Sequence, residues 1–160
     1  PNAGKSSLLA SLTSATPKIA NYKFTTLNPN LGVAIYDDRE IILADIPGLI
    51  EGAHRGTGLG IKFLKHIERC KALLHLIDVS ESDVIDSYLK VRNEMKKYSP
   101  ELLKKEEIVV FNKTDLIDKD EISEKMRSFK KSIKKSVLTT STLDKISISD
   151  IKSKLLNYVP

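Results

Sequence analysis

The spacing of hydrophobic positions changes several times along the chain, and each change predicts a new element. Leucines recur at helical spacing from Leu8 to Leu12, and the polar residues before Pro17 predict that this first helix ends near Ala15. From residue 17 to 30 no apolar period holds, so we expect a mobile loop there.

Two short strands, 31–36 and 40–46, are expected to pair antiparallel around Asp37-Asp38, a polar pair suited to a tight hairpin. The nearly continuous apolar run 72–79 is typical of a strand covered on both faces. Further helices are expected after residue 63 and over 83–98, 121–135 and 149–158, with strands over 108–111 and 136–140. Strands that alternate with helices predict a three-layer α/β fold, with a mainly parallel sheet and one antiparallel edge hairpin.

The first residues of the chain carry the clearest chemical motif. Gly4-Lys5-Ser6 matches the end of G-x-x-x-x-G-K-[ST], a phosphate-binding loop that runs into a helix. In that loop backbone N–H groups hold the phosphates, the lysine reaches the β- and γ-phosphates, and the serine binds Mg²⁺. The pattern's opening glycine and the strand before it are not in the chain. We therefore interpret residues 1–160 as one domain of the P-loop NTPase type that starts inside this loop and lacks its first strand.

A second motif, Asp45-x-x-Gly48, follows a predicted strand. A carboxylate at Asp45 can hold the Mg²⁺ shell through water. The amide of Gly48 can approach the γ-phosphate because glycine has no side chain to obstruct it. Together they are expected to sense the third phosphate.

The third motif, Asn112-Lys113-Thr114-Asp115, follows a predicted buried strand. Asp115 can accept hydrogen bonds from N1–H and the exocyclic amine of guanine, a pair of donors that adenine lacks. Lys113 offers its aliphatic stem to the base, and Asn112 can tie this loop to the phosphate loop. A glycine motif alone fits a plain helix start or many ATPases, but three motifs in this order predict a guanine-nucleotide site.

The sequence resembles the Obg family of ribosome-associated GTPases. The stretches 1–6, 22–32, 45–54 and 58–69 carry this resemblance, which covers essentially the whole chain. It implies a first switch over 24–28, with Thr26 binding Mg²⁺ and the γ-phosphate, and a second switch over 45–60. The base-binding loop is best matched by Ser141-Thr142, preceded by Thr140. The expected GTP-binding residues are Pro1, Asn2, Ala3, Gly4, Lys5, Ser6, Phe24, Thr25, Thr26, Leu27, Asn28, Asp45, Ile46, Pro47, Gly48, Asn112, Lys113, Thr114, Asp115, Thr140, Ser141 and Thr142.

Leu49 stands where many regulatory GTPases have the glutamine that orients the attacking water, so slow intrinsic hydrolysis is expected. Lys5 and Thr26 are expected to contact the γ-phosphate in the transition state, and no residue is assigned as a general base. Asn2 is a candidate K⁺ ligand, by resemblance to GTPases with asparagine there, or serves only the backbone turn of the loop. Glu51, His54 and Arg55, in the second switch, are interpreted as solvated or as partner contacts. His75, in an apolar strand, is interpreted as a hydrogen-bonded core residue, and no metal-binding cluster beyond the magnesium ligands is expected.

Net charge is +5, and basic stretches such as 130–135 suit either an RNA-rich partner or a solvated helix face. Without an apolar run of about 20 residues, the sequence predicts no membrane span and a cytoplasmic monomer. The resemblance implies a GTP/GDP switch on the large ribosomal subunit or its precursor, through rRNA and ribosomal proteins. Two alternatives stay open: a guanine-nucleotide sensor in which hydrolysis is incidental, and an RNA-binding protein dominated by its basic helices.

Overall fold

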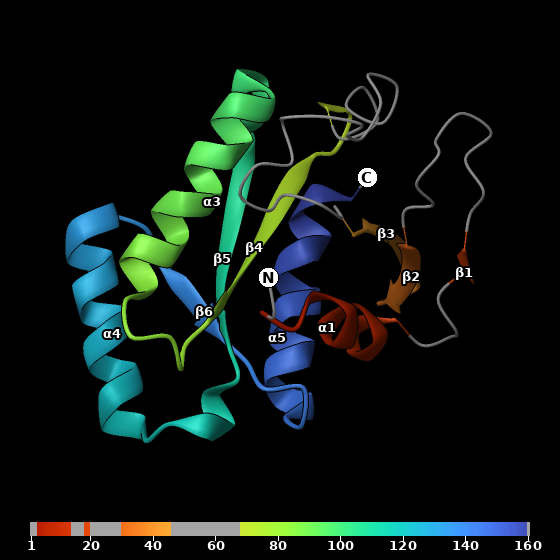
Figure 1. Ribbon diagram of the computed structural model, residues 1–160. Helices are drawn as coiled ribbons and strands as arrows, with labels where there is room; N and C mark the ends of the chain where they lie inside the picture. The colour runs from red at the N-terminus through yellow and green to blue at the C-terminus, as the bar shows by residue number, and fades with distance from the viewer. Residues whose placement is uncertain (1–2, 14–17, 20–29, 46–67, 160) are drawn as a thin grey trace.

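The structure, a computed structural model, describes residues 3–13, 18–19, 30–45 and 68–159. These residues form one antiparallel and one parallel sheet, each of three strands, with helices packed against them (Figure 1). The elements are α1 (Lys5–Leu12), β1 (Lys18–Ile19), β2 (Asn30–Tyr36), β3 (Arg39–Ala44), β4 (Ala72–Asp78), α3 (Val84–Tyr98), η2 (Pro100–Lys104), β5 (Glu106–Asn112), η3 (Thr114–Leu116), α4 (Lys119–Ile133), β6 (Val137–Thr139), α5 (Lys145–Leu155) and η4 (Leu156–Tyr158). The predicted α/β class is confirmed.

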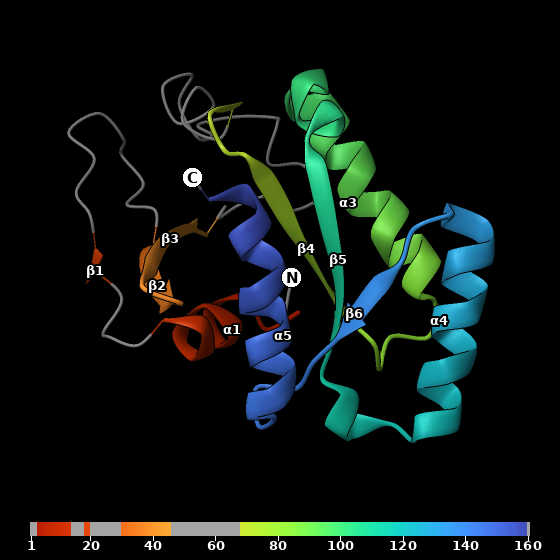
Figure 2. The ribbon, with the colours of Figure 1, turned by 180° about the vertical axis from the view of Figure 1, so that it is seen from behind.

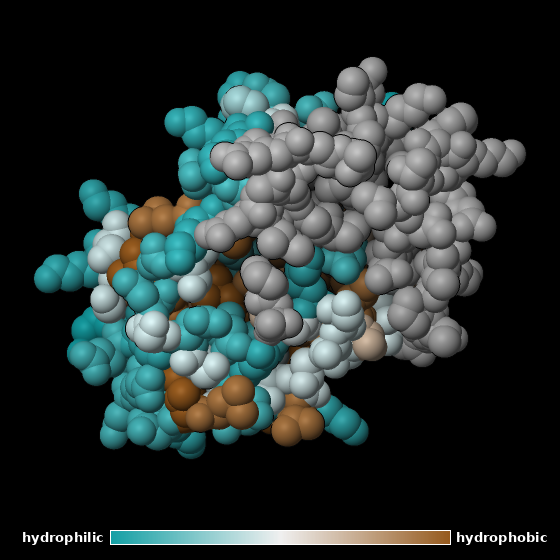
Figure 3. Space-filling view, viewed as in Figure 1, coloured by the Kyte–Doolittle hydropathy of each residue, from teal (hydrophilic) through white to brown (hydrophobic). Residues whose placement is uncertain are grey.

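The parallel sheet, in the order β4-β5-β6, lies between two helical layers. Helices α3 and α4 cover one face, and α5 and α1 lie on the other side (Figure 2). Side chains of β5 alternate between two cores: Ile108 and Val110 pack in one, Val109 and Phe111 in the other. Because both faces of this strand are buried, its sequence is continuously apolar rather than alternating. The outer surface of α3 and α4 is mostly hydrophilic (Figure 3).

The antiparallel sheet is built on the predicted hairpin. Strands β2 and β3 pair across a turn at Asp37 and Asp38, whose φ angles of 53° and 56° are those of a two-residue hairpin turn. Ala34 and Ile41 point into the core that also contains Ile108. The hairpin belongs to a sheet of its own, since β3 and β4 are not neighbours in either sheet.

The stretch expected to be a loop contains a short strand. Strand β1 pairs with β2, with Lys18 opposite Leu31, so the prediction of a continuous loop over 17–30 is wrong at these positions. Two paired residues carry too little apolar periodicity to be recognised in sequence. Residues 20–29 lie outside the described part of the chain.

Helix α1 ends three residues before the predicted end at Ala15. Thr13 has extended backbone angles, φ −97° and ψ 135°, and its hydroxyl donates to the carbonyl of Leu9 at 2.9 Å. A threonine hydroxyl that bonds the preceding turn competes with the helical pattern, which explains the early end.

Helices α4 and α5 begin earlier than predicted because each has an aspartate cap. Asp118 accepts a hydrogen bond from the backbone N–H of Glu121 at 2.9 Å, and Asp144 accepts one from that of Ile146 at 3.0 Å. Each cap fixes the helix start two to four residues before the first predicted helical position. The helix predicted over 63–67 lies outside the described residues. Among the helices that are described, none is both long and apolar enough to cross a bilayer.

Candidate functional site

The predicted phosphate loop leads into α1 through a glycine in the left-handed region. Gly4 has φ 89° and ψ 26° and is the N-cap of the helix. A Cβ at this position would lie 2.5 Å from Nδ2 of Asn112, so both the backbone angle and the space require glycine. The N–H groups of the first helical turn have no partner within the helix, so this end of α1 suits an anion.

Asn112 joins the end of β5 to this loop. Its side chain is 1% exposed, and Nδ2 donates to the backbone carbonyl of Ala3 at 2.8 Å. The contact joins residues 109 positions apart in the chain. The third motif and the first therefore meet at the carboxyl edge of the parallel sheet, as the tie inferred from sequence requires.

Asp45, just after β3, brings the second motif to the same place. Its Oδ1 lies 3.1 Å from Nζ of Lys5, and the side chains are 11% and 48% exposed, respectively. This approach is an ion pair without hydrogen-bond geometry, and Oδ1 of Asp45 is buried with no hydrogen-bond partner among the described residues. Carboxylate and hydroxyl oxygens, as on Asp45 and Ser6, are the ligand types that Mg²⁺ prefers.

Several predicted site residues fall outside the described part of the chain. They are Pro1, Asn2, the first-switch residues 24–28, and residues 46–48 of the second motif. The same holds for Leu49, Glu51, His54 and Arg55. Their roles stay predictions.

The two loops expected to contact the base lie side by side. The backbone N–H and the hydroxyl of Thr114 both donate to the carbonyl of Thr140, at 3.3 and 3.1 Å. The N–H of Thr140 in turn donates to the carbonyl of Phe111 at 2.8 Å. Asp115, in η3, is exposed, whereas Thr140 and Ser141 are buried and Thr142 is exposed. The fold thus brings residues 112–115 and 140–142 together, with the Asp115 carboxylate open to a ligand.

One ion pair at this edge was not predicted. Lys113, at φ 63°, places Nζ 2.5 Å from Oδ2 of Asp78 at the end of β4. Oδ1 of Asp78 accepts from the backbone N–H and the hydroxyl of Ser80, at 2.9 and 2.6 Å. Burial acts to raise the pKa of Asp78, but the hydrogen bonds from Lys113 and Ser80 outweigh it and hold the pKa below its usual value. The sequence signal was an aspartate at the carboxyl end of a buried strand.

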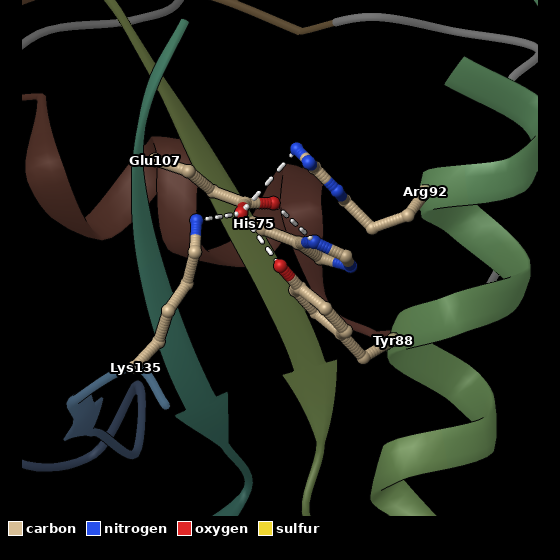
Figure 4. Close-up of polar contacts among 5 residues, drawn as sticks. All are labelled: His75, Tyr88, Arg92, Glu107 and Lys135. Carbon is tan, nitrogen blue, oxygen red and sulfur yellow. Dashed lines mark hydrogen bonds and ion pairs between the residues drawn. The ribbon is translucent and has the colours of Figure 1, made fainter. Parts of the chain in front are cut away.

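A second polar cluster lies between the parallel sheet and α3 and was also missed (Figure 4). The Glu107 side chain is 0% exposed and accepts hydrogen bonds from the hydroxyl of Tyr88 at 2.8 Å and from Nζ of Lys135 at 2.6 Å. Nδ1 of His75 lies at hydrogen-bond distance, 2.9 Å, and Arg92 forms an ion pair at 3.6 Å. Burial acts to raise the pKa of Glu107, but bonds from His75, Lys135 and Tyr88 prevail and lower it to about 2. The pKa of Tyr88 is raised to about 12 by burial and by its bond to Glu107.

This Glu107 cluster is separate from the candidate site. Glu107 pairs in register with Leu73 near the amino ends of β5 and β4, whereas Asp78 and Asn112 pair at the carboxyl ends. The expectation of a hydrogen-bonded core histidine holds for Nδ1 of His75, while its Nε2 is buried without a partner in the described part of the chain. Among the described residues, no group of three or more His, Cys, Asp or Glu side chains is placed to hold a metal ion.

Comparison with known proteins agrees with this architecture. The family model described as "50S ribosome-binding GTPase" matches residues 1–113. GTPase Obg of Pelagibacter ubique is 66% identical over 99% of this chain, and GTPase Obg of Ehrlichia chaffeensis is 53% identical over 99%. The chain covers 49% and 46% of these proteins, so it spans about half the length of the curated relatives that it matches.

Among solved structures, Era in complex with MgGDPNP and nucleotides 1506-1542 of 16S ribosomal RNA is 26% identical, with a TM-score of 0.75. The alignment covers 100% of this chain and 54% of the Era chain. The predicted P-loop fold and the resemblance to Obg are both confirmed. The chain therefore belongs to the 50S ribosome-binding GTPase family and is of the Obg type.

Proposed function

We propose that this chain binds GTP and GDP, hydrolyses GTP slowly, and acts as a nucleotide-controlled switch. One observation carries the proposal: three motifs that are far apart in the sequence meet at one edge of the fold. Lys5 lies against Asp45, and Asn112 holds the carbonyl of Ala3. A carboxylate and a lysine beside a helix N-terminus suit a nucleotide phosphate and its cation.

In this proposal the phosphates lie on the loop of residues 1–6, with Lys5 at the β- and γ-phosphates. Ser6 and Thr26 hold Mg²⁺ directly, and Asp45 holds it through water. The buried Oδ1 of Asp45 supports this assignment, because it faces the ammonium of Lys5 at 3.1 Å but has no hydrogen-bond partner among the described residues. When bound, Mg²⁺ neutralises charge on the phosphate oxygens. Residues 24–28, the first switch, and residues 46–48, within the second switch over 45–60, complete the phosphate site.

The base binds between residues 112–115 and 140–142. Leaving the Asp115 carboxylate unpaired against adenine would cost a few kcal/mol, so GTP is preferred over ATP by at least about a hundredfold. The test is to titrate the chain with GTP, GDP and ATP in the presence of Mg²⁺. Equal competition by ATP would contradict this role for Asp115.

A substitution sharpens this test. Asn in place of Asp115 offers one acceptor and one donor, which suits xanthine, with its N1–H and 2-oxo group, better than guanine. Asp115→Asn should weaken GTP binding by about a hundredfold or more and strengthen XTP binding. Asp120→Asn is the matched control, because Asp120 is also exposed, five residues further along the chain, in the first turn of α4.

Hydrolysis is proposed to be slow because Leu49 cannot orient water. Asn2 is proposed to help bind a K⁺ ion that supplies positive charge near the transferred phosphate. Equal single-turnover rates in sodium and potassium would remove this role.

The proposed partner is the large ribosomal subunit or its precursor, met in the cytoplasm by a monomer of this protein. The family description, 50S ribosome-binding, and the net charge of +5 support it. Co-sedimentation with 50S subunits should depend on whether GTP or GDP is bound. Salt-dependent binding that ignores the nucleotide would instead favour plain RNA binding.

A guanine-nucleotide sensor is the second candidate, because Leu49 favours binding without rapid turnover. The two candidates differ in one measurement, which is GTP turnover with and without 50S subunits. A switch is expected to be accelerated by its partner, whereas a sensor is not.

A further inference from the structure

The Asp78–Lys113 pair connects two strands at the edge where the base is proposed to bind. Asp78 is the last residue of β4 and lies opposite Asn112, the last residue of β5. Lys113 follows directly and turns back in the left-handed region at φ 63°. Its ammonium reaches Asp78 at 2.5 Å, and the two side chains are 31% and 11% exposed.

The aspartate is itself held in place. Its Oδ1 is occupied by the N–H and hydroxyl of Ser80, which leaves Oδ2 for the lysine. A lysine side chain loses about 1.5–2 kcal/mol of conformational entropy when it is fixed, so an unanchored lysine stem makes a poor surface for a flat ligand. Here the fold fixes the side chain by its charged end.

The loop that carries Ser80 is anchored to α4. Nζ of Lys125 donates to the carbonyls of Val79 and Glu81 at 2.8 and 2.9 Å, and the N–H of Val79 donates to the carbonyl of Asn112 at 3.0 Å. These bonds fix the backbone that directly follows Asp78, at Val79 and Glu81. The carboxylate is therefore presented to Lys113 by backbone that is held in the fold independently of any ligand.

We infer that Asp78 is a positioning residue for the base of the bound nucleotide, holding the ammonium of Lys113 so that the aliphatic stem forms one wall of the base site. This inference rests on the proposed function. Asp78 itself does not touch the nucleotide. Its effect is transmitted through Lys113, and Ser80 orients Asp78.

A double-mutant cycle tests the inference. The dissociation constants of GDP and GTP are measured with Mg²⁺ for the wild type, Asp78→Asn, Lys113→Met and the double variant. Methionine keeps an unbranched stem without the charge. We expect each single variant to weaken both nucleotides by about tenfold, and the double variant to be no weaker than Lys113→Met within about twofold.

The two nucleotides should lose affinity by the same factor, because they share the base and differ only in phosphate. Asp86→Asn is the control, since Asp86 also pairs with a lysine, Lys90 at 2.8 Å, but on the exposed face of α3. It should leave both dissociation constants unchanged. If Asp78→Asn does not fold, Ser80→Ala provides a milder variant, with an expected loss of about threefold.

Four results would overturn the inference. The first is no loss of affinity in Asp78→Asn, or in Ser80→Ala where that replaces it, and the second is that Asp78→Asn weakens binding by its full factor even when Lys113→Met is already present. The third is unequal losses for GDP and GTP, and the fourth is a Lys113→Met loss far beyond that of Asp78→Asn, which would mean that the ammonium contacts the nucleotide directly. A full-length wild-type protein containing this chain that binds neither guanine nucleotide would instead contradict the proposed function. The two failures are therefore distinguishable.

Discussion

The paired strands β4 and β5 have charged side chains near each end of the pair, Asp78 and Lys113 at the carboxyl ends and Glu107 near the amino ends, and these charges have different surroundings. At the carboxyl ends, Asp78 and Lys113 are 11% and 31% exposed, and the nearby Asp45 retains a buried oxygen without a hydrogen-bond partner among the described residues. At the amino ends, Glu107 is 0% exposed and is surrounded by donors. In the described part of the chain, the buried atoms without a hydrogen-bond partner at the carboxyl ends are acceptor oxygens, Oδ1 of Asp45 and Oδ1 of Asn112, which leave room for a cation or a ligand donor. At the amino ends they are nitrogens of His75 and Arg92, around a carboxylate that is already surrounded by donors and committed to the fold.

The comparison implies different consequences of mutation at the two ends. Loss of the Glu107 carboxylate should reduce stability and leave the nucleotide affinity of the folded protein intact. Changes at the carboxyl ends should reduce nucleotide affinity by more than they reduce stability. A buried ion cluster is not stabilising by default, because the cost of desolvation can offset the attraction between its charges. Stability and nucleotide affinity are therefore measured separately for variants at each end.

The largest effect is expected for Glu107→Gln. The change removes the buried negative charge that Lys135, Arg92 and His75 share; although the Lys135 and Arg92 side chains are 37% and 24% exposed, we expect a loss of about 3 kcal/mol of unfolding free energy. Urea denaturation measures this loss. Glu106→Gln, at the exposed neighbouring residue, is the control and should change stability by less than about 0.5 kcal/mol. Equal effects of the two variants would remove the distinction between the ends.

The pH dependence of the unfolding free energy should also report on the Glu107 carboxylate. The pKa of Glu107 is lowered from 4.5 to about 2 in the folded protein, so its ionised form contributes stability above pH 4.5. That contribution is lost as the pH falls from about 4.5 to about 2, because the unfolded chain takes up a proton before the folded one does. The unfolding free energy of the wild type should therefore fall more steeply in this range than that of Glu107→Gln. Parallel curves would contradict the assignment.

At the carboxyl end, Gly4→Ala should act mainly on the ligand. The positive φ costs about 1–2 kcal/mol for a residue with a Cβ. The new Cβ would also lie 2.5 Å from Asn112 Nδ2 and displace the bond to Ala3. We expect GDP affinity to fall by more than about tenfold, measured by titration at a temperature where the variant is folded. Ala10→Ser, at an exposed position of the same helix, should bind GDP normally.

The smallest effect is expected for Lys90→Ala. Lys90 and Asp86 form an ion pair at 2.8 Å on α3, but their side chains are 60% and 53% exposed. Such a pair contributes at most about 0.5 kcal/mol and is screened by salt. Denaturation at low and high salt checks this, and a loss comparable to that of Glu107→Gln would show that burial does not distinguish the two pairs.

Local patterns in the sequence were sufficient for most elements of the fold. The helix predicted over 83–98 is α3, which begins at Val84 because Asp83 caps it, and the apolar run 72–79 contains β4. The hairpin at Asp37-Asp38 was readable because a polar turn pair separates two short strand-like runs. The short strand β1 was not, since a pairing of two residues leaves no periodic signal.

The candidate site was predictable in part for a different reason. Gly4, Asp45 and Asn112 belong to motifs that end strands or begin a helix, so the fold class places them at one edge of the sheet. Pairs that depend on side chains crossing the structure were not predictable. Lys113 meets Asp78 across 35 residues, and Glu107 meets His75 across 32. No local spacing encodes such contacts, and the functional roles of the site residues stay predictions.

The hydrogen bond from Asn112 to Ala3 also has a consequence in time. Asn112, the anchor of the phosphate loop, is synthesised 109 residues after Ala3. At about 5–20 residues per second, a ribosome needs on the order of 5–20 s to add that distance. During this interval the loop cannot be held in the geometry described above. Competence to hold a nucleotide therefore arises only after Asn112 has been synthesised, well after the loop itself.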